Sequence, residues 1–272
     1  MLNLQTIEKS LSADCENCFG LCCVALPFAK TADFAFDKEG GTPCRNLQPD
    51  FRCGIHQNLR NEGLKGCTVY ECFGAGQKVS QVTFSGNDWR TYPELADDMY
   101  FVFPIMQQLH EMLSYLHEAL QLNETTDMRE KLKIAYNEIE DLTLHDPNSL
   151  KKLDVSSSRA MVNDLLLQAS ELVRAKVANK RKNGKRKDFI GAKLKGSNMS
   201  GCNLRGALFI AADLRGADLR KTDLIGADFR DADLSGANLT GSIFLTQAQV
   251  NSAKGDANTQ LPQKLKVPNH WI

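Results

Sequence analysis

The sequence has no apolar run near the about 18 residues that a membrane-spanning helix needs. The segment MLNLQTIEKSLSADC lacks the basic start and apolar core of a secretion signal. Net charge is absent as well, because 33 Lys and Arg balance 33 Asp and Glu. From these absences we expect a cytoplasmic protein without membrane association. In that reducing compartment, the nine cysteines are expected to be thiols or metal ligands and not disulfides.

The motifs of common enzymes are also missing. The chain contains no glycine-rich loop for cradling phosphates and no G-x-S-x-G nucleophile turn. The sequence therefore predicts no catalytic residues, and it favours a binding or structural role over an enzyme without deciding the matter.

A repeat is what the sequence does contain, because residues 187–246 form twelve consecutive five-residue units. The third residue of every unit is large and apolar, and the first is nearly always small. A period of five fits neither a strand nor a helix, whose side chains repeat every 2 and 3.6 residues. Fixed repeats of this kind are typical of a solenoid.

Four such units can close a square turn of the chain, so twelve units predict three coils. The third-position side chains then fill the interior, and glycine at the fifth position suits a tight corner. Successive coils are expected about 4.8 Å apart, the spacing of paired strands. Phe189, Phe209 and Phe229 are separated by one full coil each, which predicts a stacked aromatic ladder. Leu214, Leu219, Leu224 and Leu234 are expected to be buried.

Outward positions of two neighbouring coil sides are apolar. One side carries Ile190, Leu208 and Ile210, and the next carries Ile225, Ile243 and Leu245. A contiguous apolar exterior usually marks an interface. We therefore expect these sides to dock on the helical segment, on a protein partner or on a second copy of the chain, and we do not expect nucleic acid as a partner.

Cysteine is concentrated near the start, where the first four cysteines read C-x2-C-x3-C-C. The eight candidate metal ligands are Cys15, Cys18, Cys22, Cys23, Cys44, Cys53, Cys67 and Cys72. A C-x2-C pair lets two thiolates reach one metal ion. The surrounding sequence is too poor in apolar residues for a core, so a metal cross-link would hold it together. Thiolate-rich sites select zinc or iron–sulfur clusters, and we expect Zn²⁺, with an iron–sulfur cluster as the alternative.

The adjacent Cys22 and Cys23 leave the number of metals open. They can serve two metals, bridge a binuclear centre, or leave one thiol unused. His56 is a spare nitrogen ligand, three residues after Cys53. Buried thiols without metal are the competing interpretation.

Residues 92–183 read as helical. Apolar residues at three- and four-residue steps predict helices over 94–121, 126–144 and 157–182, with Pro104 kinking or dividing the first and Ser157 or Ser158 capping the last. A short turn is expected after Asp146. His110 and His117 share one helical face and are expected to be partly buried, more than metal-bound.

Two resemblances fit these patterns. The units, such as ADLRG and ANLTG, resemble the pentapeptide-repeat family, which implies a right-handed quadrilateral β-helix of about three coils. The cysteine pattern of roughly 12–78 resembles YkgJ-type cysteine-cluster domains, which implies zinc or iron chelation.

The expected fold is thus a multidomain α+β chain with four parts: a Cys-rich region at 1–91, helices at 92–183, the coil at 184–246, and a cap at 247–272 anchored by Leu261, Leu265, Val267 and Trp271. The expected function is metal binding, with the coil as a protein-interaction scaffold. The alternatives are an iron–sulfur or redox protein, and a topoisomerase-protecting DNA mimic of the kind known in the pentapeptide-repeat family.

Overall fold

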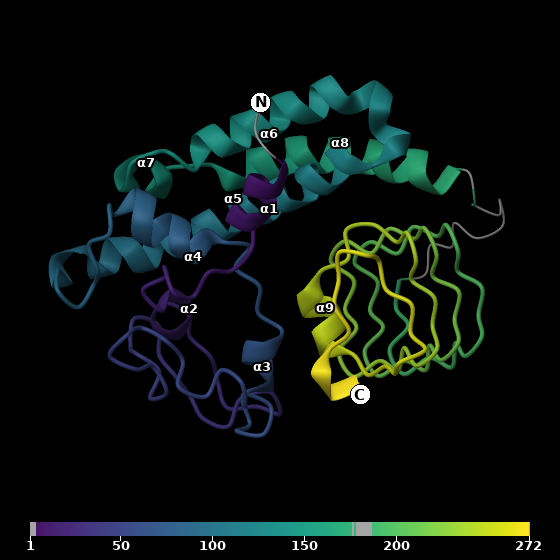
Figure 1. The fold of residues 1–272 in the computed structure, drawn as a ribbon, viewed down its shortest axis with the longest axis horizontal. Coiled ribbons are helices and arrows are strands. Elements are labelled where there is room, and N and C mark those ends of the chain that lie inside the picture. The colour runs from purple at the N-terminus through teal and green to yellow at the C-terminus, as the bar shows by residue number, and fades with distance from the viewer. Residues whose placement is uncertain (1–3, 176, 178–186, 272) are drawn as a thin grey trace. The chain divides into compact units, whose positions relative to one another are not determined.

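A computed structural model describes residues 4–175, 177 and 187–271 (Figure 1). Contacts divide the chain into two units, Met1–Leu120 with Arg129–Asp164, and Gln121–Met128 with Leu165–Ile272. Neither unit coincides with one of the four predicted parts, whose boundaries stay a prediction.

The first unit combines irregular loops with helices. Its short helices are α1 (Leu4–Ser10), α2 (Leu21–Val24), α3 (Lys65–Thr68), α4 (Ala75–Gln77), the π-helical η1 (Lys78–Thr83) and the 3-10 turn η2 (Pro93–Leu95). The longer ones are α5 (Ala96–Gln121), α6 (Arg129–Leu142), α7 (Pro147–Lys151) and α8 (Val155–Ala175), and the last of these continues into the second unit. Apolar residues at helical spacing on α5 are buried, among them Met99, Val102, Met106, Leu109 and Leu116.

Two details of the helices bear on the sequence predictions. Of the two outcomes expected at Pro104, a kink or a division, the division does not occur, because α5 runs as one element through this residue. The last long helix begins at Val155, and Asp154 accepts hydrogen bonds from the backbone N–H of Ser156 and Ser157. Asp154 therefore serves as the cap that was expected of Ser157 or Ser158. The predicted end of this helix at 182 lies outside the described residues.

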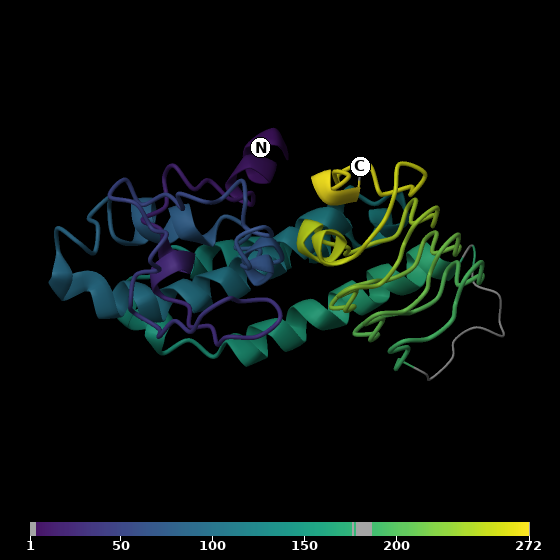
Figure 2. The ribbon, with the colours of Figure 1, turned by 90° about the horizontal axis from the view of Figure 1, so that it is seen from below.

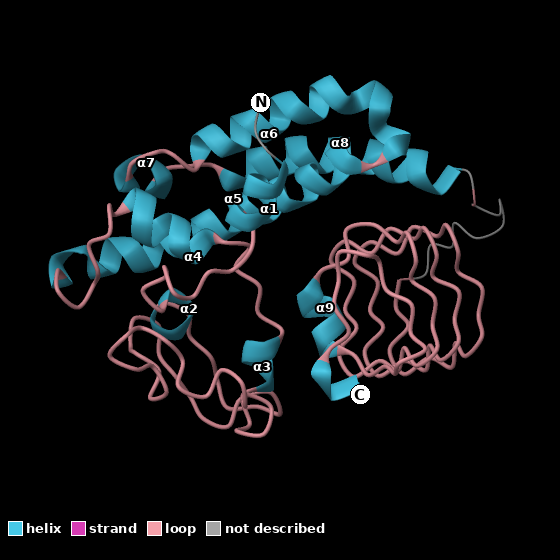
Figure 3. Ribbon diagram, viewed as in Figure 1, coloured by secondary structure: helices cyan, strands magenta, loops and turns pink. Residues whose placement is uncertain are grey.

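The second unit contains the coil, whose turns repeat every twenty residues. Parallel bridges join residues twenty apart, from Asp188–Leu208 through Asp223–Ile243. Figure 3 draws these turns as loops, because no strand is assigned anywhere in the described ranges. Each side pairs through one residue before the chain reaches a corner, so consecutive bridges that would make a strand do not form. The β-helix is therefore present as isolated bridges, not as a strand-built sheet.

The interior of the coil is packed as predicted. Leu214, Leu219, Leu224 and Leu234 are at most 1% exposed. Phe189, Phe209 and Phe229 stack with ring centroids 5.0 and 5.1 Å apart and ring planes within 8° of parallel. The aromatic ladder is thus confirmed. Cys202 is buried in the same cluster.

The corners of the coil use a left-handed backbone at the fifth position even where glycine is missing. Ala211, Lys221 and Asp231 have φ angles of 55°, 52° and 57°. The second-position Asp or Asn supports the corner, since its side chain accepts a hydrogen bond from the backbone N–H two residues on, as Asp213 does from Arg215 at 3.2 Å. This turn is typical of Asp and Asn.

The tail covers the last turn of the coil (Figure 2). Lys254 pairs with Asp233, and Gln260 pairs with Asn238. The helix α9 (Gln247–Ser252) begins with a capping box at Thr246, and Gln249 Nε2 donates to the carbonyls of Leu224 and Ala227. Before the closing turn η4 (Asn269–Trp271), Leu261 and Leu265 pack against the coil interior, and Trp271 joins it, whereas Val267 is 39% exposed.

The six apolar residues expected on the outside of the coil differ in burial. Ile190 and Leu208 are 53% and 38% exposed, and Ile210 and Ile225 are half-buried. Ile243 and Leu245 are only 2% and 1% exposed. In the last unit the left-handed backbone conformation occurs at Phe244, two positions before the fifth position where the other units have it. Leu245 consequently belongs to the interior cluster.

Two helical pieces of the same unit contact the coil. Glu124, in the 3-10 helix η3 (Asn123–Met128), forms an ion pair of 3.1 Å with Lys221. Arg174 of α8 donates to the carbonyl of Gly201 at 3.5 Å.

Candidate metal centre

The eight N-terminal cysteines all lie in the first unit and all are free thiols. Cys22 and Cys23 sit in α2, Cys67 sits in α3, and the other five lie in loops. The segment before α2 is fixed by distant residues, because Trp89 Nε1 donates to the carbonyl of Phe19 and Ser80 Oγ accepts from its N–H. These bonds tie the first cysteine loop to residues outside the cysteine segment.

Gly20 sets the start of α2. Its φ is 66°, and a Cβ there would lie 2.7 Å from Leu47 Cδ1 and 2.9 Å from the carbonyl oxygen of Phe51. Only glycine allows this approach of the two loops. The result brings the Cys22–Cys23 pair toward the loop that carries Cys44 and Cys53.

One neighbourhood of thiols surrounds Cys23. Its carbonyl accepts from the N–H of Cys44 at 2.9 Å. Its hydrogen bond with Cys22 raises the pKa of the Cys23 thiol, whereas its hydrogen bond with Cys53 lowers the pKa of Cys23 and raises that of Cys53. Burial raises the pKa of Cys67 to about 11, and nearby Cys44 and Cys53 add to the effect. Four thiols, Cys23, Cys44, Cys53 and Cys67, therefore influence one another.

A second neighbourhood contains Cys15, Cys18 and Cys72. Cys18 Sγ packs against Gly76, and a Cβ at position 76 would lie only 2.6 Å from this sulfur. Position 76 therefore requires glycine. Burial raises the pKa of Cys18 to about 11, and Cys72 and Cys15 raise it further. Cys22 links the two neighbourhoods. Its sulfur lies 4.0 Å from the sulfur of Cys23. It also lies near Cys72 and Cys18, because all three thiols add to the effect of burial in raising the pKa of Tyr70.

A buried lysine accompanies the thiols. Lys38 is 7% exposed, and its Nζ donates to the carbonyls of Val24, Glu39 and Thr42 at 2.9 to 3.0 Å. Burial lowers its pKa, and Cys44, Cys23, Cys22 and Cys67 are close enough to raise it. Among the described residues no carboxylate pairs with this ammonium group. A buried cation without a carboxylate fits best beside sulfur that carries negative charge.

The eight cysteines suit a soft metal ion as ligands, because none of them forms a disulfide and a buried cation lies beside four of them. Within the described ranges, however, no three Cys, His, Asp or Glu side chains converge closely enough to enclose an ion. His56, the spare ligand of the prediction, is exposed. The assignment of the eight cysteines as ligands therefore stays a prediction.

The two histidines of α5 are buried more deeply than expected, at 4% and 7% exposure. His110 Nδ1 lies 2.8 Å from the carbonyl of Phe73, and His117 Nε2 lies 3.9 Å from Glu8 Oε1. Neither points to a metal role. Sequence reasoning missed Lys38 and Tyr70, and nothing in the spacing of residues marks either one.

The coil surface has no acidic stripe of the kind that a DNA mimic needs. Asp213, Asp218 and Asp228 each pair at 2.7 Å with the arginine two residues on. The buried Asp223 pairs with Arg205 at 3.0 Å. These ion pairs neutralise the coil locally and disfavour the DNA-mimic alternative.

Comparison with known proteins identifies relatives of the whole chain and of the coil. The chain is 62% identical over 268 residues to the protein named Uncharacterized protein YybG of Bacillus subtilis (strain 168), with 97% of this chain and 96% of YybG covered. The family model for pentapeptide repeats matches residues 188–224 and 207–244.

Two solved structures share the repeat. A pentapeptide-repeat protein from the Arabidopsis thaliana thylakoid lumen is 29% identical, covering 30% of this chain and 58% of its own, with a TM-score of 0.16. A pentapeptide-repeat protein from Nostoc Pcc 7120 is 34% identical, covering 32% and 83%, with a TM-score of 0.14.

None of the helices in the described part of the chain has the length and apolar character to cross a membrane. The repeat match and the near full-length similarity lead to one conclusion: the chain is a pentapeptide-repeat protein that belongs to the same family as YybG of Bacillus subtilis.

Proposed function

We propose that this protein binds a soft metal ion, Zn²⁺ in the first instance, through its N-terminal thiols and uses the coil as a protein-interaction scaffold. The observation that carries the metal proposal is the buried Lys38 ammonium, which has three carbonyl partners, no carboxylate partner among the described residues, and four thiols close enough to affect its pKa. Metal-bound thiolates would supply the missing negative charge.

The two thiol neighbourhoods suggest two sites. Cys23, Cys44, Cys53 and Cys67 would hold one ion, and Cys15, Cys18, Cys22 and Cys72 would hold the other. Adjacent Cys22 and Cys23 would then serve different ions, as one of the alternatives from the sequence allows. A bound zinc ion would supply a tetrahedral cross-link between loops that have little core of their own.

The protein's own residues prepare this binding. Gly76 gives Cys18 room, Gly20 lets the two cysteine loops approach each other, and Lys38 would stabilise thiolate charge. The raised pKa values of Cys18 and Cys67, about 11 each, keep the free thiols protonated at neutral pH. Metal binding would therefore release protons, as thiolate sites generally do.

Elemental analysis of protein purified without oxygen tests the proposal. We expect about two zinc ions per chain and no visible colour, with one ion lost in Cys23→Ser/Cys53→Ser. Cys202→Ala is the matched control, because Cys202 lies in the coil and its position usually holds alanine in this repeat. A metal-free wild-type protein would overturn the proposal, and a brown protein with bound iron would replace zinc by the iron–sulfur alternative.

For the scaffold role, the available apolar surface is smaller than the sequence suggested. Ile190, Leu208 and Ile210 lie on the first two turns, where Gly191 N–H donates to the carbonyl of Ile210 and Asp188 pairs with Leu208. They would form one apolar patch on stacked turns. Ile243 and Leu245 are too buried to take part.

Sedimentation analysis of Ile190→Lys/Leu208→Lys tests self-association through this patch. We expect the wild-type protein to dimerise at micromolar concentration and the variant to stay monomeric, since a charge desolvated in an apolar interface is costly. The control is Arg220→Lys/Arg230→Lys on other exposed positions of the coil. Equal masses for the wild type and the patch variant would remove self-association as the scaffold function.

A further inference from the structure

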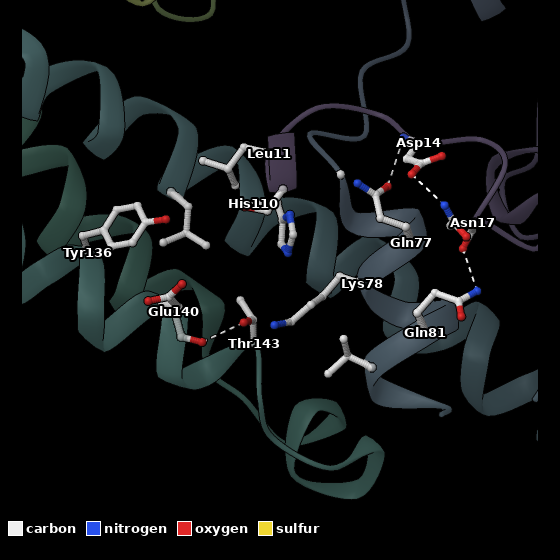
Figure 4. A pocket seen from close by; sticks show the side chains of 14 residues that line it. Leu11, Asp14, Asn17, Gln77, Lys78, Gln81, His110, Tyr136, Glu140 and Thr143 are labelled. Atoms are coloured by element: carbon white, nitrogen blue, oxygen red, sulfur yellow. Dashed lines mark hydrogen bonds between the residues drawn. The ribbon is translucent and has the colours of Figure 1, made fainter. Parts of the chain in front are cut away.

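A pocket of mixed polar and apolar lining lies in the first unit, and none of the eight N-terminal cysteines lines it. It has a volume of about 370 Å³ and is lined by the segment before α2, by α4 and η1, and by α5 and α6 (Figure 4). This size is at the lower end of the range for small-molecule sites. Leu11, Val82 and Leu113 contribute apolar walls.

His110 presents an unpartnered nitrogen to this pocket. The residue is 4% exposed, and its Nδ1 must carry the proton because it bonds to the carbonyl of Phe73. Burial lowers the pKa of His110 to about 4, so the ring is neutral at pH 7. Its Nε2 is therefore an acceptor, and no described residue donates to it.

Lys78, Glu140 and Tyr136 add three further polar groups. Burial lowers the pKa of Lys78, and Glu140 partly restores it, yet no hydrogen bond or ion pair joins Lys78 Nζ to a described residue. Tyr136 is 3% exposed, and burial and Glu140 raise the pKa of its phenol to about 12, so it remains a hydrogen-bond donor. Figure 4 shows the ends of these side chains turned toward the same space as His110.

We propose that this pocket binds a small zwitterion of the size and chemistry of a free amino acid. Lys78 would pair with the carboxylate of the ligand, with help from the Tyr136 hydroxyl. Glu140 and His110 Nε2 would accept hydrogen bonds from its ammonium group. A ligand that carries charge of only one sign would leave either Lys78 or Glu140 without an opposite charge. An unpaired charge is unfavourable at a partly buried site.

The complementarity also explains why four polar groups share a small pocket without pairing directly. Polar groups at buried positions, such as His110 and Tyr136, are nearly always hydrogen-bonded, while Lys78 and Glu140 are half-buried. The other polar side chains of the lining already have partners within the protein, and these are Ser10, Asp14, Asn17, Gln77, Gln81 and Thr143. The remaining groups together present two acceptors and two donors, which matches the ends of an α-amino acid.

Isothermal titration of the full-length protein with each of the common L-amino acids tests the proposal. We expect at least one to bind with a dissociation constant of about 1 mM or tighter. Its N-acetyl and carboxamide derivatives, which each lack one charge, should bind at least about tenfold more weakly. Lys78→Met and Glu140→Gln should each weaken binding by a similar factor, whereas Lys131→Met, at an exposed position of α6, should not.

A second readout keeps the test independent of folding defects. In protein labelled with ¹⁵N-histidine, the bound amino acid should shift the Nε2 resonance of His110 and leave that of the exposed His56 unchanged. Absence of binding by every amino acid up to about 10 mM would overturn the proposal. So would equal binding of the N-acetyl derivative, or unchanged affinity in both Lys78→Met and Glu140→Gln.

Discussion

At the scale of single residues, the proposed metal binding rests most on Lys38. Its ammonium group is buried, and three backbone carbonyls hold it within reach of four thiols. Deeply buried charges are rare unless they are paired. The carbonyls satisfy its hydrogen bonds, but only negative sulfur nearby would balance its charge.

Replacement of this lysine should weaken metal binding. Lys38→Met is expected to lower zinc affinity by about tenfold or more, because each lost interaction of about 1.4 kcal/mol changes an equilibrium tenfold. Competition with a coloured chelator measures the change. Lys30→Met is the control, since Lys30 is exposed in the same region. Equal zinc affinity in Lys38→Met would show that Lys38 has only a structural role.

Backbone strain at Ala211 is a second feature of residue scale. Its φ of 55° is unfavourable for a residue with a Cβ, by about 1–2 kcal/mol, while glycine loses more chain entropy on folding. We expect Ala211→Gly to raise the free energy of unfolding by about 0.5–1 kcal/mol. Urea denaturation followed by circular dichroism measures this effect.

The reverse change at an equivalent corner is the matched control for Ala211. Gly216 has a φ of 63°, and an added Cβ would meet nothing within 4 Å. Gly216→Ala should therefore cost about 1 kcal/mol through the backbone alone. A lower free energy of unfolding in Ala211→Gly would contradict the prediction, because it would show that alanine causes no backbone strain at this corner.

At the scale of elements, the coil depends on its interior ladder. Phe209 is fully buried between Phe189 and Phe229. Phe209→Ala should cost about 3–5 kcal/mol, the usual range for a buried phenylalanine. Phe209→Leu should cost much less, because leucine fills the same position in most other units. Similar losses for the two variants in urea denaturation would argue against a close-packed interior at this position.

The corner aspartates give the coil a pH dependence. Hydrogen bonds from Arg215 lower the pKa of Asp213 to about 2. A carboxylate with a lowered folded-state pKa stabilises the fold above its unfolded pKa of about 4, and that contribution disappears as the pH falls toward 2. In Asp213→Asn, which keeps the oxygen acceptor, the stability lost between pH 4 and 2 should be smaller than in the wild type. Identical acid denaturation curves would contradict this.

Several elements could be predicted from the sequence because their signals are local. The five-residue period fixed which side chains face the axis, and residues twenty apart do pair. A failure arose where neighbouring signals compete. Asp154 takes the cap position ahead of Ser157, because its carboxylate reaches two backbone N–H groups.

The candidate site was less accessible to such reasoning. Cysteine spacing marked eight candidate ligands, whose role stays a prediction. The pocket around His110 gave no signal in the sequence, because segments far apart in the chain line it. Leu245 shows the same limit in the coil, since an early left-handed residue at Phe244 ends the repeat register and Leu245 is buried. Such effects depend on packing, which a period cannot reveal.

At the scale of the whole molecule, the cysteine region and the coil are stabilised by different means. The coil has a contiguous apolar interior, whereas the region that carries the thiols is built largely from loops. If the proposed metal ions cross-link these loops, their loss should unfold the loops and leave the coil folded. We expect Cys15→Ser/Cys18→Ser to become protease-sensitive before α5 while residues 187–271 stay protected, as measured by mass spectrometry of the fragments.

Cys202→Ala serves as the control for this experiment, because it changes a cysteine without touching the candidate ligands. Cleavage within the coil of Cys15→Ser/Cys18→Ser would show that the two regions unfold together. Resistance of the loops to protease after complete metal removal would show that they fold without a cross-link.

The twenty-residue repeat has a consequence for how this protein can change in length. Removing or duplicating one whole turn leaves every interior column in phase and returns the chain to the same corner, so α9 and Trp271 still meet the surface they close. Insertion of a single five-residue unit instead rotates everything downstream by a quarter turn and presents the closing segment to the wrong side. Viable insertions and deletions in the coil should therefore come in multiples of twenty residues.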